Sequence, residues 1–248
     1  MHNVPLSSFI ENEEKLEFAI TEEEMFEMTT EHDPLVNIKG TRAAADKIIE
    51  KIKASVFKNY GTSRDDPTLP TTFLATYIKF GLLSCRQVLE AVRGNEVLTA
   101  QIYWREFYYY VTWHDPKLLD GQIGEANKAM KIRMQNIKWK EAEGTHWDAW
   151  CEGKTGIPIV DAGQRQLLQT GEMHNRARMV SAMFLTKNLH ISWIHGEKFF
   201  AQHLIDYDPC QNNGGWQWSA STGVDTQPYR IFNPWLQVLY IESLLIFR

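Results

Sequence analysis

The spacing of apolar side chains is the feature that most limits what this chain can fold into. After Gly40, apolar residues recur at helical intervals, as they do at Ala45, Ile48, Ile52 and Val56. This spacing is typical of one face of an α-helix, whereas the strict alternation of a half-buried strand is nearly absent. The sequence therefore predicts an all-α domain whose helices are joined by long loops.

Capping patterns and breakers place these helices along the chain. Thr41 is a suitable N-cap for the first helix, and Ser84 with Gln87 forms a capping-box pattern. The helix over residues 97–113 is apolar and aromatic on nearly every side, so we expect it to be buried. Other helices are predicted over 71–81, 161–170, 175–188 and 196–205, with a polar loop over 60–70 and a long loop after 113 that holds Trp139, Trp147 and Trp150.

Charge and cysteine content narrow the class of protein. The chain has 248 residues and a net charge of −5, but residues 1–33 carry ten acidic side chains and one lysine, so the remainder stands at +4. An acidic leader is typical of a solvated linker, and a mildly cationic body permits DNA binding. Cys85, Cys151 and Cys210 lie far apart, which indicates reduced thiols in an intracellular protein of the cytoplasm or nucleus.

Several kinds of site are not expected from the sequence. No apolar run approaches the length of a membrane span and the start lacks the pattern of a signal peptide, so we expect no membrane partner. The histidines show no metal-ligand spacing with carboxylates or cysteines, so no metal site is predicted. No Ser-His-Asp or Cys-His arrangement stands out either.

The stretch from Asn212 to Gly223 mixes amide, glycine, indole and hydroxyl groups with almost no aliphatic side chains. Paired glycines allow a close approach of the backbone, and amides both donate and accept hydrogen bonds. The mixture suits a planar ligand with polar edges, such as an isoalloxazine ring or a nucleobase. A glycine-rich turn with two packed indoles, Trp216 and Trp218, fits the same residues, so both interpretations stay open.

Three segments together carry a resemblance to a known family. Residues 212–234 read NNGGWQWSASTGVDTQPYRIFNP, residues 150–167 read WCEGKTGIPIVDAGQRQL, and residues 173–179 read MHNRARM. In this order they resemble the class I cyclobutane pyrimidine dimer DNA photolyases of the cryptochrome/photolyase family. The resemblance extends from about Asn37 to Gln237 and implies a helical FAD-binding domain of the photolyase/cryptochrome type over residues 37–237.

The resemblance also implies that parts of the family's chain are missing. Residues 1–36 correspond to a remnant of an acidic interdomain linker, and residues 238–248 form an apolar tail that does not match. The α/β domain that usually carries an antenna chromophore is absent from this chain. Truncation at both ends, or a separate chain that supplies the missing N-terminal domain, would explain this pattern.

FAD is the cofactor that the resemblance implies. Arg178 and Asp206 match a charged pair beside the flavin ring, although a buried ion pair between two helices fits the same spacing. Asn212 matches an amide against flavin N5, where it would tune the ring. The implied cofactor-binding residues are Tyr60, Thr71, Thr72, Phe73, Leu74, Arg178, Asp206, Asp208 and Asn212.

The implied diphosphate contacts depart from the family at one position. Thr71 and Thr72 match residues that hold the phosphates at a helix N-terminus, where simple helix caps would look the same. The family's pattern ends in serine where this chain has Ala75, so one phosphate contact is lost.

Damaged DNA is the partner that the resemblance implies. Trp104 and Trp218 match two indoles that hold a flipped pyrimidine dimer, and such stacking is worth about 1–3 kcal/mol per base. Gln101 stands three residues before Trp104, where the family usually has Glu, and its amide donates a hydrogen bond without needing a proton. Further substrate or DNA contacts are implied for Arg64, Asn175, Arg176 and Met179.

The implied activity is the light-driven repair of cyclobutane pyrimidine dimers by electron transfer from reduced FAD, a deoxyribodipyrimidine photo-lyase reaction. Trp216, Trp193 and Trp139 match a chain of electron carriers, although one residue is inserted between Trp139 and Trp150 relative to the usual pattern. Two alternatives stay open: a cryptochrome-like blue-light photoreceptor, and a truncated remnant that binds DNA or flavin without catalysis. The residues implied in catalysis are Gln101, Trp104, Asn175, Trp139, Trp193 and Trp216.

Overall fold

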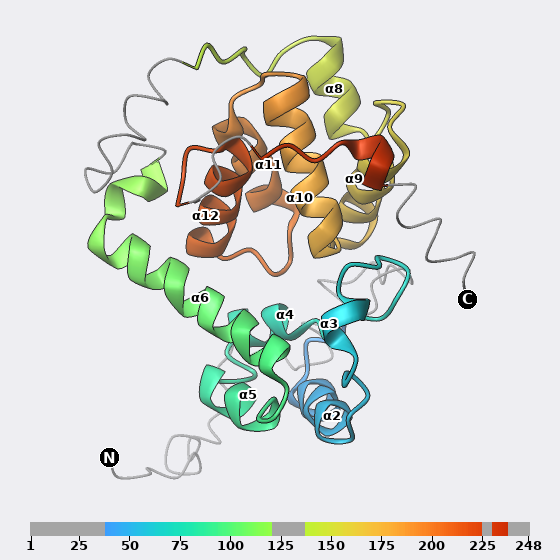
Figure 1. Cartoon of the computed structure of the whole chain (residues 1–248), viewed down its shortest axis with the longest axis vertical. Helices are drawn as coiled ribbons and strands as arrows, with labels where there is room; N and C mark the ends of the chain where they lie inside the picture. Colours follow the sequence, from blue (N-terminus) through green and yellow to red (C-terminus); the bar gives the residue numbers. More distant parts are fainter. Residues whose placement is uncertain (1–37, 121–136, 225–229, 238–248) are drawn as a thin grey trace, which may run out of the picture. The chain divides into compact units, whose positions relative to one another are not determined.

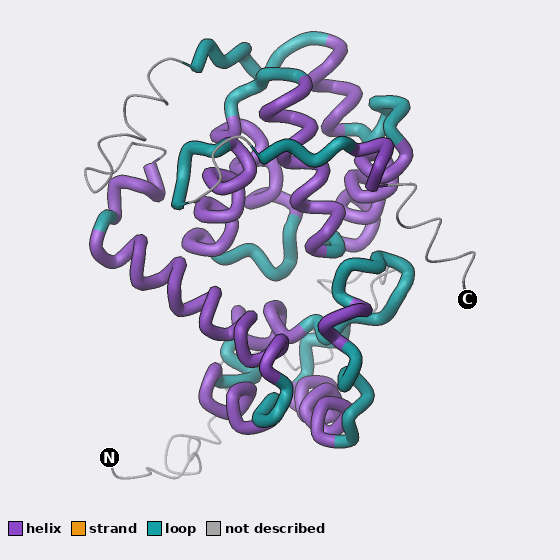
Figure 2. The backbone as a smooth tube through the Cα atoms, in the orientation of Figure 1, coloured by secondary structure: helices purple, strands orange, loops and turns teal. Residues whose placement is uncertain are grey.

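The computed structural model of the chain describes residues 38–120, 137–224 and 230–237, all of which belong to one unit, Val36–Arg248. Within these ranges the regular elements are helices, and extended backbone pairs only at one isolated bridge (Figure 2). The prediction of an all-α fold is therefore confirmed. The acidic segment and the apolar tail that the sequence set apart lie outside the described residues.

The first group of helices surrounds its own hydrophobic core (Figure 1). It consists of α2 (Arg42–Lys53), α3 (Tyr60–Ser63), α4 (Leu74–Lys79), α5 (Cys85–Ala91) and the N-terminal half of α6 (Glu96–His114). Ala45 and Val88 are completely buried at the centre of this core, and Ile102 of α6 closes it. The helical spacing of apolar residues thus places them on the inner faces of these helices.

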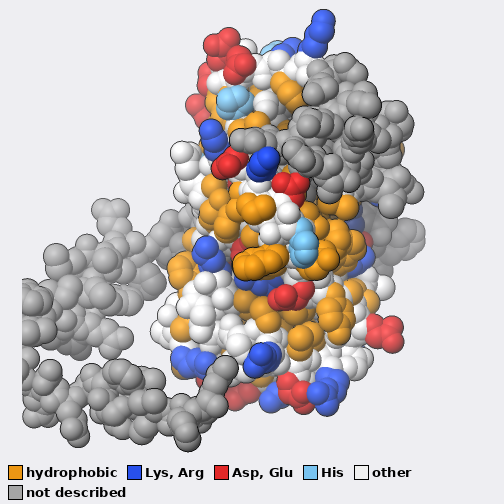
Figure 3. All heavy atoms as spheres, turned by 90° about the vertical axis from the view of Figure 1, so that its left-hand side faces the viewer, with side chains coloured by type: hydrophobic (Ala, Val, Ile, Leu, Met, Phe, Trp, Pro, Cys, Tyr) orange, Lys and Arg blue, Asp and Glu red, His pale blue; other side chains and the backbone are white. Residues whose placement is uncertain are grey.

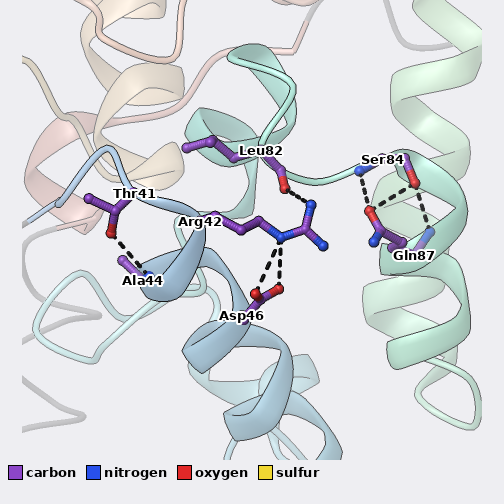
Figure 4. Close-up of polar contacts among 7 residues, drawn as sticks. All are labelled: Thr41, Arg42, Ala44, Asp46, Leu82, Ser84 and Gln87. Carbon is purple, nitrogen blue, oxygen red and sulfur yellow. Dashed lines mark hydrogen bonds and ion pairs between the residues drawn. The ribbon is translucent and has the colours of Figure 1, made fainter. Parts of the chain in front are cut away.

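The predicted N-caps are confirmed (Figure 4). The Thr41 hydroxyl accepts the backbone N–H three residues further on at 3.2 Å. The Ser84 hydroxyl accepts the Gln87 N–H at 3.2 Å, and the Gln87 amide oxygen accepts the Ser84 N–H at 3.0 Å. Arg42 also donates to the Leu82 carbonyl at 2.9 Å, which ties α2 to the segment between α4 and α5. Local sequence therefore fixes where these short helices begin.

The second group of helices follows α6 and surrounds a larger core (Figure 1). After the 3₁₀ helix η2 (Pro116–Asp120) come α8 (Thr145–Cys151), α9 (Pro158–Thr170), α10 (Asn175–Met183), the π-helical turn η3 (Phe184–Asn188), α11 (Trp193–His203) and α12 (Pro209–Ala220). α9 packs on α10 and α11 packs on α12, while α6 contacts both α12 and the first group. One long helix thus contacts both groups of helices.

Several sequence predictions about loops were wrong. The polar segment 60–70 contains the short helix α3, and the segment after α6 contains α8, which carries Trp147 and Trp150. The helix predicted from residue 71 begins only at Leu74, because Phe73 has a φ of 51° and cannot be part of it. Val56 lies beyond the end of α2 and is exposed, since the chain turns there.

The expected burial of α6 was also wrong. Only Leu98 and Ile102 of this helix are buried, whereas Tyr103, Tyr110 and Trp113 are exposed. Figure 3 faces the side along which α6 runs in Figure 1, and hydrophobic side chains gather on that face. A helix that is apolar on all sides is not necessarily covered on all sides. Among the described residues, the aromatic side chains of α6 form part of the protein surface.

The stretch from Asn212 to Gly223 lies mostly in the helix α12 and is not the glycine-rich turn that was one of its two interpretations. Asp208 caps this helix by accepting the N–H groups of Cys210 and Gln211, both at 3.1 Å, and Pro209 occupies the first turn. An added Cβ at Gly214 would lie 2.2 Å from the Tyr108 ring of α6, whereas nothing lies within 4 Å of such an atom at Gly215. Gly214 therefore permits the close approach of α12 to α6, a reason for the glycine that the sequence did not reveal.

Candidate functional site

Arg178 and Asp206 form the ion pair that the sequence analysis expected. Arg178 lies on α10, and its Nη2 donates to Asp206 Oδ2 at 3.0 Å, while its Nε donates to the Met173 carbonyl at 2.7 Å. Asp206 lies in the segment between α11 and α12, so the pair does not join two helices. The other carboxylate oxygen, Asp206 Oδ1, is buried and has no hydrogen-bond partner among the described residues.

Glu172 is a third charged group at this pair, which the sequence analysis missed. It is only 7% exposed, and its Oε1 is buried with no hydrogen-bond partner among the described residues. Burial raises the pKa of Glu172, the nearby Asp206 raises it further, and Arg178 opposes both effects. The Ile205 N–H donates to the Gly171 carbonyl at 2.9 Å, which holds the two carboxyl-bearing segments together. A carboxyl next to MHNRARM was visible in the sequence, but its burial was not.

His174 is the N-cap of α10 and lies directly before Asn175 and Arg176. Its Nδ1 accepts the Arg176 N–H at 3.2 Å, which requires a ring nitrogen without a proton. Burial lowers the pKa of His174, and the positive charges of Arg178 and Arg176 lower it further. The uncharged imidazole thus orients the first turn of α10, where Asn175 and Arg176 stand.

Asp208, which was expected to contact the flavin, has several hydrogen-bonding and charged partners within the protein. Besides capping α12, it accepts a hydrogen bond from Tyr109 and pairs with Arg105 Nη2 at 3.2 Å. Its side chain is 5% exposed and that of Arg105 16% exposed, so this is a mostly buried pair. Burial raises the pKa of Tyr109 to about 12, with the Asp208 hydrogen bond as the next cause. Arg105 and Tyr109 were missed because nothing in the sequence links α6 to a residue a hundred positions later.

Asn212 lies on the face of α12 that meets α11. Its Nδ2 donates to the Glu197 carbonyl at 3.1 Å and to Glu197 Oε1 at 3.0 Å. Burial raises the pKa of Glu197, and the Asn212 hydrogen bond partly offsets this effect. The amide expected to face a flavin is thus oriented by a second carboxyl that the sequence analysis did not select.

Thr71 and Thr72, the expected diphosphate contacts, lie in the irregular segment before α4. Thr72 and Leu74 are buried, and Phe73 separates the two threonines from the helix. Because α4 is only six residues long, the argument from a helix N-terminus does not apply to Thr71 and Thr72. Tyr60 begins α3, and burial raises the pKa of its hydroxyl.

The residues expected to face DNA fall into two separate contact sets. Asn175 Nδ2 contacts Met179 Sδ at 3.4 Å, and Arg176 forms an ion pair with Asp65, the residue after Arg64. The ring centroids of Trp218 and Phe232 are 6.3 Å apart, and Arg176 Cζ lies 5.7 Å from the Phe232 ring centroid. Phe232 therefore connects α10 and α12 in this region.

Trp104 belongs to the second set, on α6. Its side chain is 55% exposed. Its ring centroid lies 5.5 Å from that of Phe107 and 6.5 Å from that of Tyr108, both on the same helix. Gln101 donates to the Val97 carbonyl at 3.2 Å, one turn earlier on α6. The structure places Gln101 beside its own backbone, and the ring contacts of Trp104 lie within α6.

The expected electron carriers lie in or beside the second core. Trp216 and Trp193 are each 2% exposed, and Trp139 packs against the same core as a half-buried side chain. The ring contacts of Trp216 are with Phe200 at 4.9 Å and with Trp150 at 6.0 Å. Trp150 is completely buried and is part of the same core.

The described residues contain neither a metal-binding cluster nor a helix that could cross a membrane. No group of three or more histidine, cysteine, aspartate or glutamate side chains there is arranged to hold a metal ion. Among the helices of the described ranges, none combines the length and the apolar character that crossing a membrane requires.

The arrangement around Arg178 fits a flavin ring. Two buried carboxyl oxygens, Glu172 Oε1 and Asp206 Oδ1, lack a donor within the described protein. Buried oxygens of this kind are costly unless a partner supplies N–H or O–H groups. A flavin carries a ring N–H and the hydroxyls of its ribityl chain, so Glu172, Arg178 and Asp206 are suited to hold its polar edge.

Comparisons with known proteins point to one family. Residues 97–243 match the family described as the FAD binding domain of DNA photolyase. A deoxyribodipyrimidine photo-lyase of Vibrio cholerae is 44% identical over 189 residues, which cover 71% of this chain and 39% of that protein. The chain therefore spans about two fifths of the length of this curated relative.

Solved structures agree with this assignment. A bacterial class III photolyase from Agrobacterium tumefaciens has a TM-score of 0.72 and 37% identity, over 82% of this chain and 42% of that one. A cryptochrome of Synechocystis sp. PCC6803 has a TM-score of 0.72 and 29% identity, over 86% of this chain and 45% of that one.

Proposed function

Because the chain belongs to the family of the FAD binding domain of DNA photolyase, we propose that it binds FAD and acts in the light-driven repair of cyclobutane pyrimidine dimers in DNA, as a deoxyribodipyrimidine photo-lyase. The proposed functional unit spans residues 37–237. The observation that carries the proposal is the buried cluster of Glu172, Arg178 and Asp206, whose two unpartnered carboxyl oxygens require a donor. Bound FAD in its reduced form would supply the electron that light transfers to the dimer.

The residues proposed to hold FAD come from three parts of the chain. Arg178 and Asp206 orient the polar edge of the ring, and Asn212 is held in position for it by Glu197. Asp208 fixes the start of α12 relative to α6 through Arg105. Hydroxyl groups before α4 are proposed to contact the phosphates, without help from a helix N-terminus. The full proposed set is Tyr60, Thr71, Thr72, Phe73, Leu74, Arg178, Asp206, Asp208 and Asn212.

Binding of FAD is tested by refolding the protein with FAD, followed by desalting and absorption spectroscopy. We expect a flavin spectrum with resolved vibrational structure, and weaker retention in Arg178→Met. This substitution leaves Asp206 without its guanidinium partner while keeping a long side chain. Arg93→Met is a matched control, because Arg93 forms an exposed ion pair with Glu90 on α5. A wild-type protein that retains no FAD would contradict the proposal.

DNA is proposed to bind where Trp104 and Trp218 offer indole faces. Trp104 is 55% exposed, and base stacking on such a ring does not depend on sequence. Arg176 adds positive charge near Trp218, because both contact the Phe232 ring, although Asp65 pairs with Arg176. Arg64 is proposed as a further DNA contact. Asn175 and Met179 stand on the same face of α10 and are proposed to line the substrate cavity. Trp216, Trp193 and Trp139 are proposed to conduct electrons to the cofactor.

Gln101 is the departure that tests repair most directly. Its amide can donate a hydrogen bond to a dimer carbonyl, worth about 0.5–1.5 kcal/mol, but it cannot transfer a proton. We expect Gln101→Glu to repair a thymine-dimer oligonucleotide faster than wild type, and Gln101→Ala to repair it slowest, at equal flavin content. Equal rates in all three would remove Gln101 from the site.

A cryptochrome-like photoreceptor is the second candidate function. The Synechocystis cryptochrome matches 86% of this chain at a TM-score of 0.72, so the fold serves both classes. A protein that holds FAD and is photoreduced, but repairs no dimer in any Gln101 variant, would favour the photoreceptor. If it repairs none and is not photoreduced, the remnant that only binds flavin or DNA is favoured.

A further inference from the structure

Three indole rings form a continuous contact path from the buried core to the surface of the second helix group. Trp216 of α12 meets Trp150 of α8 with ring centroids 6.0 Å apart and an interplanar angle of 72°. Trp150 stacks on Trp147, one turn earlier on α8, at 5.4 Å and 24°. Trp216 is 2% exposed, Trp150 is completely buried and Trp147 is half-buried, so the path ends at a ring that solvent reaches.

The two ends of this path differ in their surroundings. The Trp216 Nε1 is buried with no hydrogen-bond partner among the described residues, and the Trp150 Nε1 donates to the Ser181 carbonyl at 3.2 Å. Trp147 faces the His195 ring at 6.2 Å, and His195 Nε2 lies 3.5 Å from Glu141 Oε2. The outer ring therefore stands beside polar side chains that are exposed to solvent at least in part, and these stabilise positive charge better than the core does.

We propose that Trp147, Trp150 and Trp216 form an electron relay that reaches the surface at α8, separate from the one ending at Trp139. This inference rests on the proposed function for its use, because photoexcited oxidised FAD is the electron acceptor that Trp216 would serve. Indole is among the most easily oxidised side chains, and rings in van der Waals contact exchange electrons without an intervening group. The α8 tryptophans are then more than core packing.

The electron and proton balance of the relay is simple. Trp216 loses one electron to the acceptor, Trp150 replaces it, and Trp147 replaces the electron of Trp150. The oxidised Trp147 loses its indole N–H proton to solvent and becomes a neutral radical. An external thiol then returns one electron and one proton to Trp147, so the relay ends unchanged and the thiol is oxidised.

The relay can be tested without any flavin, by oxidation from outside. Apo-protein is illuminated with a ruthenium tris-bipyridine complex and persulfate, which oxidise accessible tryptophans, and peptide mass spectrometry then locates the oxidised indoles. We expect oxidised product at Trp150, although it is completely buried. In Trp147→Phe the product at Trp150 should fall severalfold, and Trp147→Tyr, whose ring can still be oxidised, should restore part of it.

A matched control variant and a second measurement distinguish failure of the relay from failure of the proposed function. Trp113→Phe removes an 83% exposed indole on α6 and should leave oxidation of Trp150 unchanged. With FAD bound, blue light and thiol should reduce the flavin severalfold more slowly in Trp139→Phe/Trp147→Phe than in Trp139→Phe alone. Equal oxidation of Trp150 in wild type and Trp147→Phe overturns the relay, whether or not the protein binds FAD. Loss of FAD binding alone overturns only the proposed function.

Discussion

Replacing Gly214 by alanine tests whether α6 and α12 are held at the distance that the structure shows. An added Cβ would lie 2.2 Å from Tyr108 Cδ1, 2.4 Å from Cε1 and 3.1 Å from Cγ, all in one ring. Atoms near the base of an aromatic ring cannot move aside without a change of rotamer or a shift of the helix. We therefore expect α12 to be displaced from α6 in Gly214→Ala.

The magnitude follows from comparison with the neighbouring glycine. Alanine is favoured over glycine within a helix by about 0.8–1 kcal/mol, and this gain applies equally to both positions. Overpacking costs about 1–3 kcal/mol, and it applies only at Gly214, because nothing lies within 4 Å of a Cβ at Gly215. Gly214→Ala should thus be about 1–3 kcal/mol less stable than Gly215→Ala, while Gly215→Ala should be slightly more stable than wild type.

The assay is urea unfolding followed by tryptophan fluorescence, with wild type and both variants at the same protein concentration. A difference of 1 kcal/mol corresponds to about 2–4 °C in Tm for a chain of this size, so thermal unfolding gives an independent reading. If both alanine variants gain stability equally, the close approach of α12 to Tyr108 is refuted. If both lose it equally, the loss comes from the helix itself and not from packing on α6.

Three further predictions concern titratable groups that are buried or partly buried. Because the pKa of Glu172 is raised in the folded protein, its contribution to stability is complete below its ordinary pKa of 4.5 and is lost as pH rises through the raised value. The free energy of unfolding of Glu172→Gln, measured across pH, should not show this loss. Parallel profiles for the variant and the wild type would contradict the raised pKa. Burial raises the pKa of Cys151 to about 12, so iodoacetamide at neutral pH should leave this thiol unmodified until the protein is unfolded, and rapid labelling of the native protein would show the thiol to be exposed. Asp208→Asn keeps an oxygen that can cap α12 but leaves Arg105 without its carboxylate, so unfolding in urea should show a loss of about 3 kcal/mol, and a loss below about 0.5 kcal/mol would mean that the ion pair is not needed.

Much of the local structure was readable from the sequence. Thr41 and the Ser84–Gln87 box cap helices as predicted, because a hydroxyl next to an apolar periodic segment serves its own backbone. The break between the helices predicted over 161–170 and 175–188 is confirmed, since Gly171 between them has a φ of 68° that favours glycine. Interactions of this kind involve residues close in sequence, so their chemistry can be read directly.

The predictions that were wrong concern contacts between residues far apart in the sequence. Whether α6 is buried depends on which elements cover it, and the apolar pattern of one helix does not contain that information. The glycines near Asn212 suggested a turn as one interpretation because glycine is poor in helices, yet Gly214 lies within a helix where a ring of α6 touches the backbone. Tertiary contact overrides propensity at such positions.

The sequence by itself determined that this chain is helical, where several of its helices begin, and which family it resembles. These properties depend on local hydrogen bonding, on apolar periodicity and on motifs that are continuous in the chain. Only the tertiary structure decided that Glu172 joins Arg178 and Asp206, that Arg105 meets Asp208, and that Trp147 and Trp150 continue the contact path of Trp216. Each of these contacts brings together residues from separate elements, and burial gives them charges and contacts that no single segment specifies.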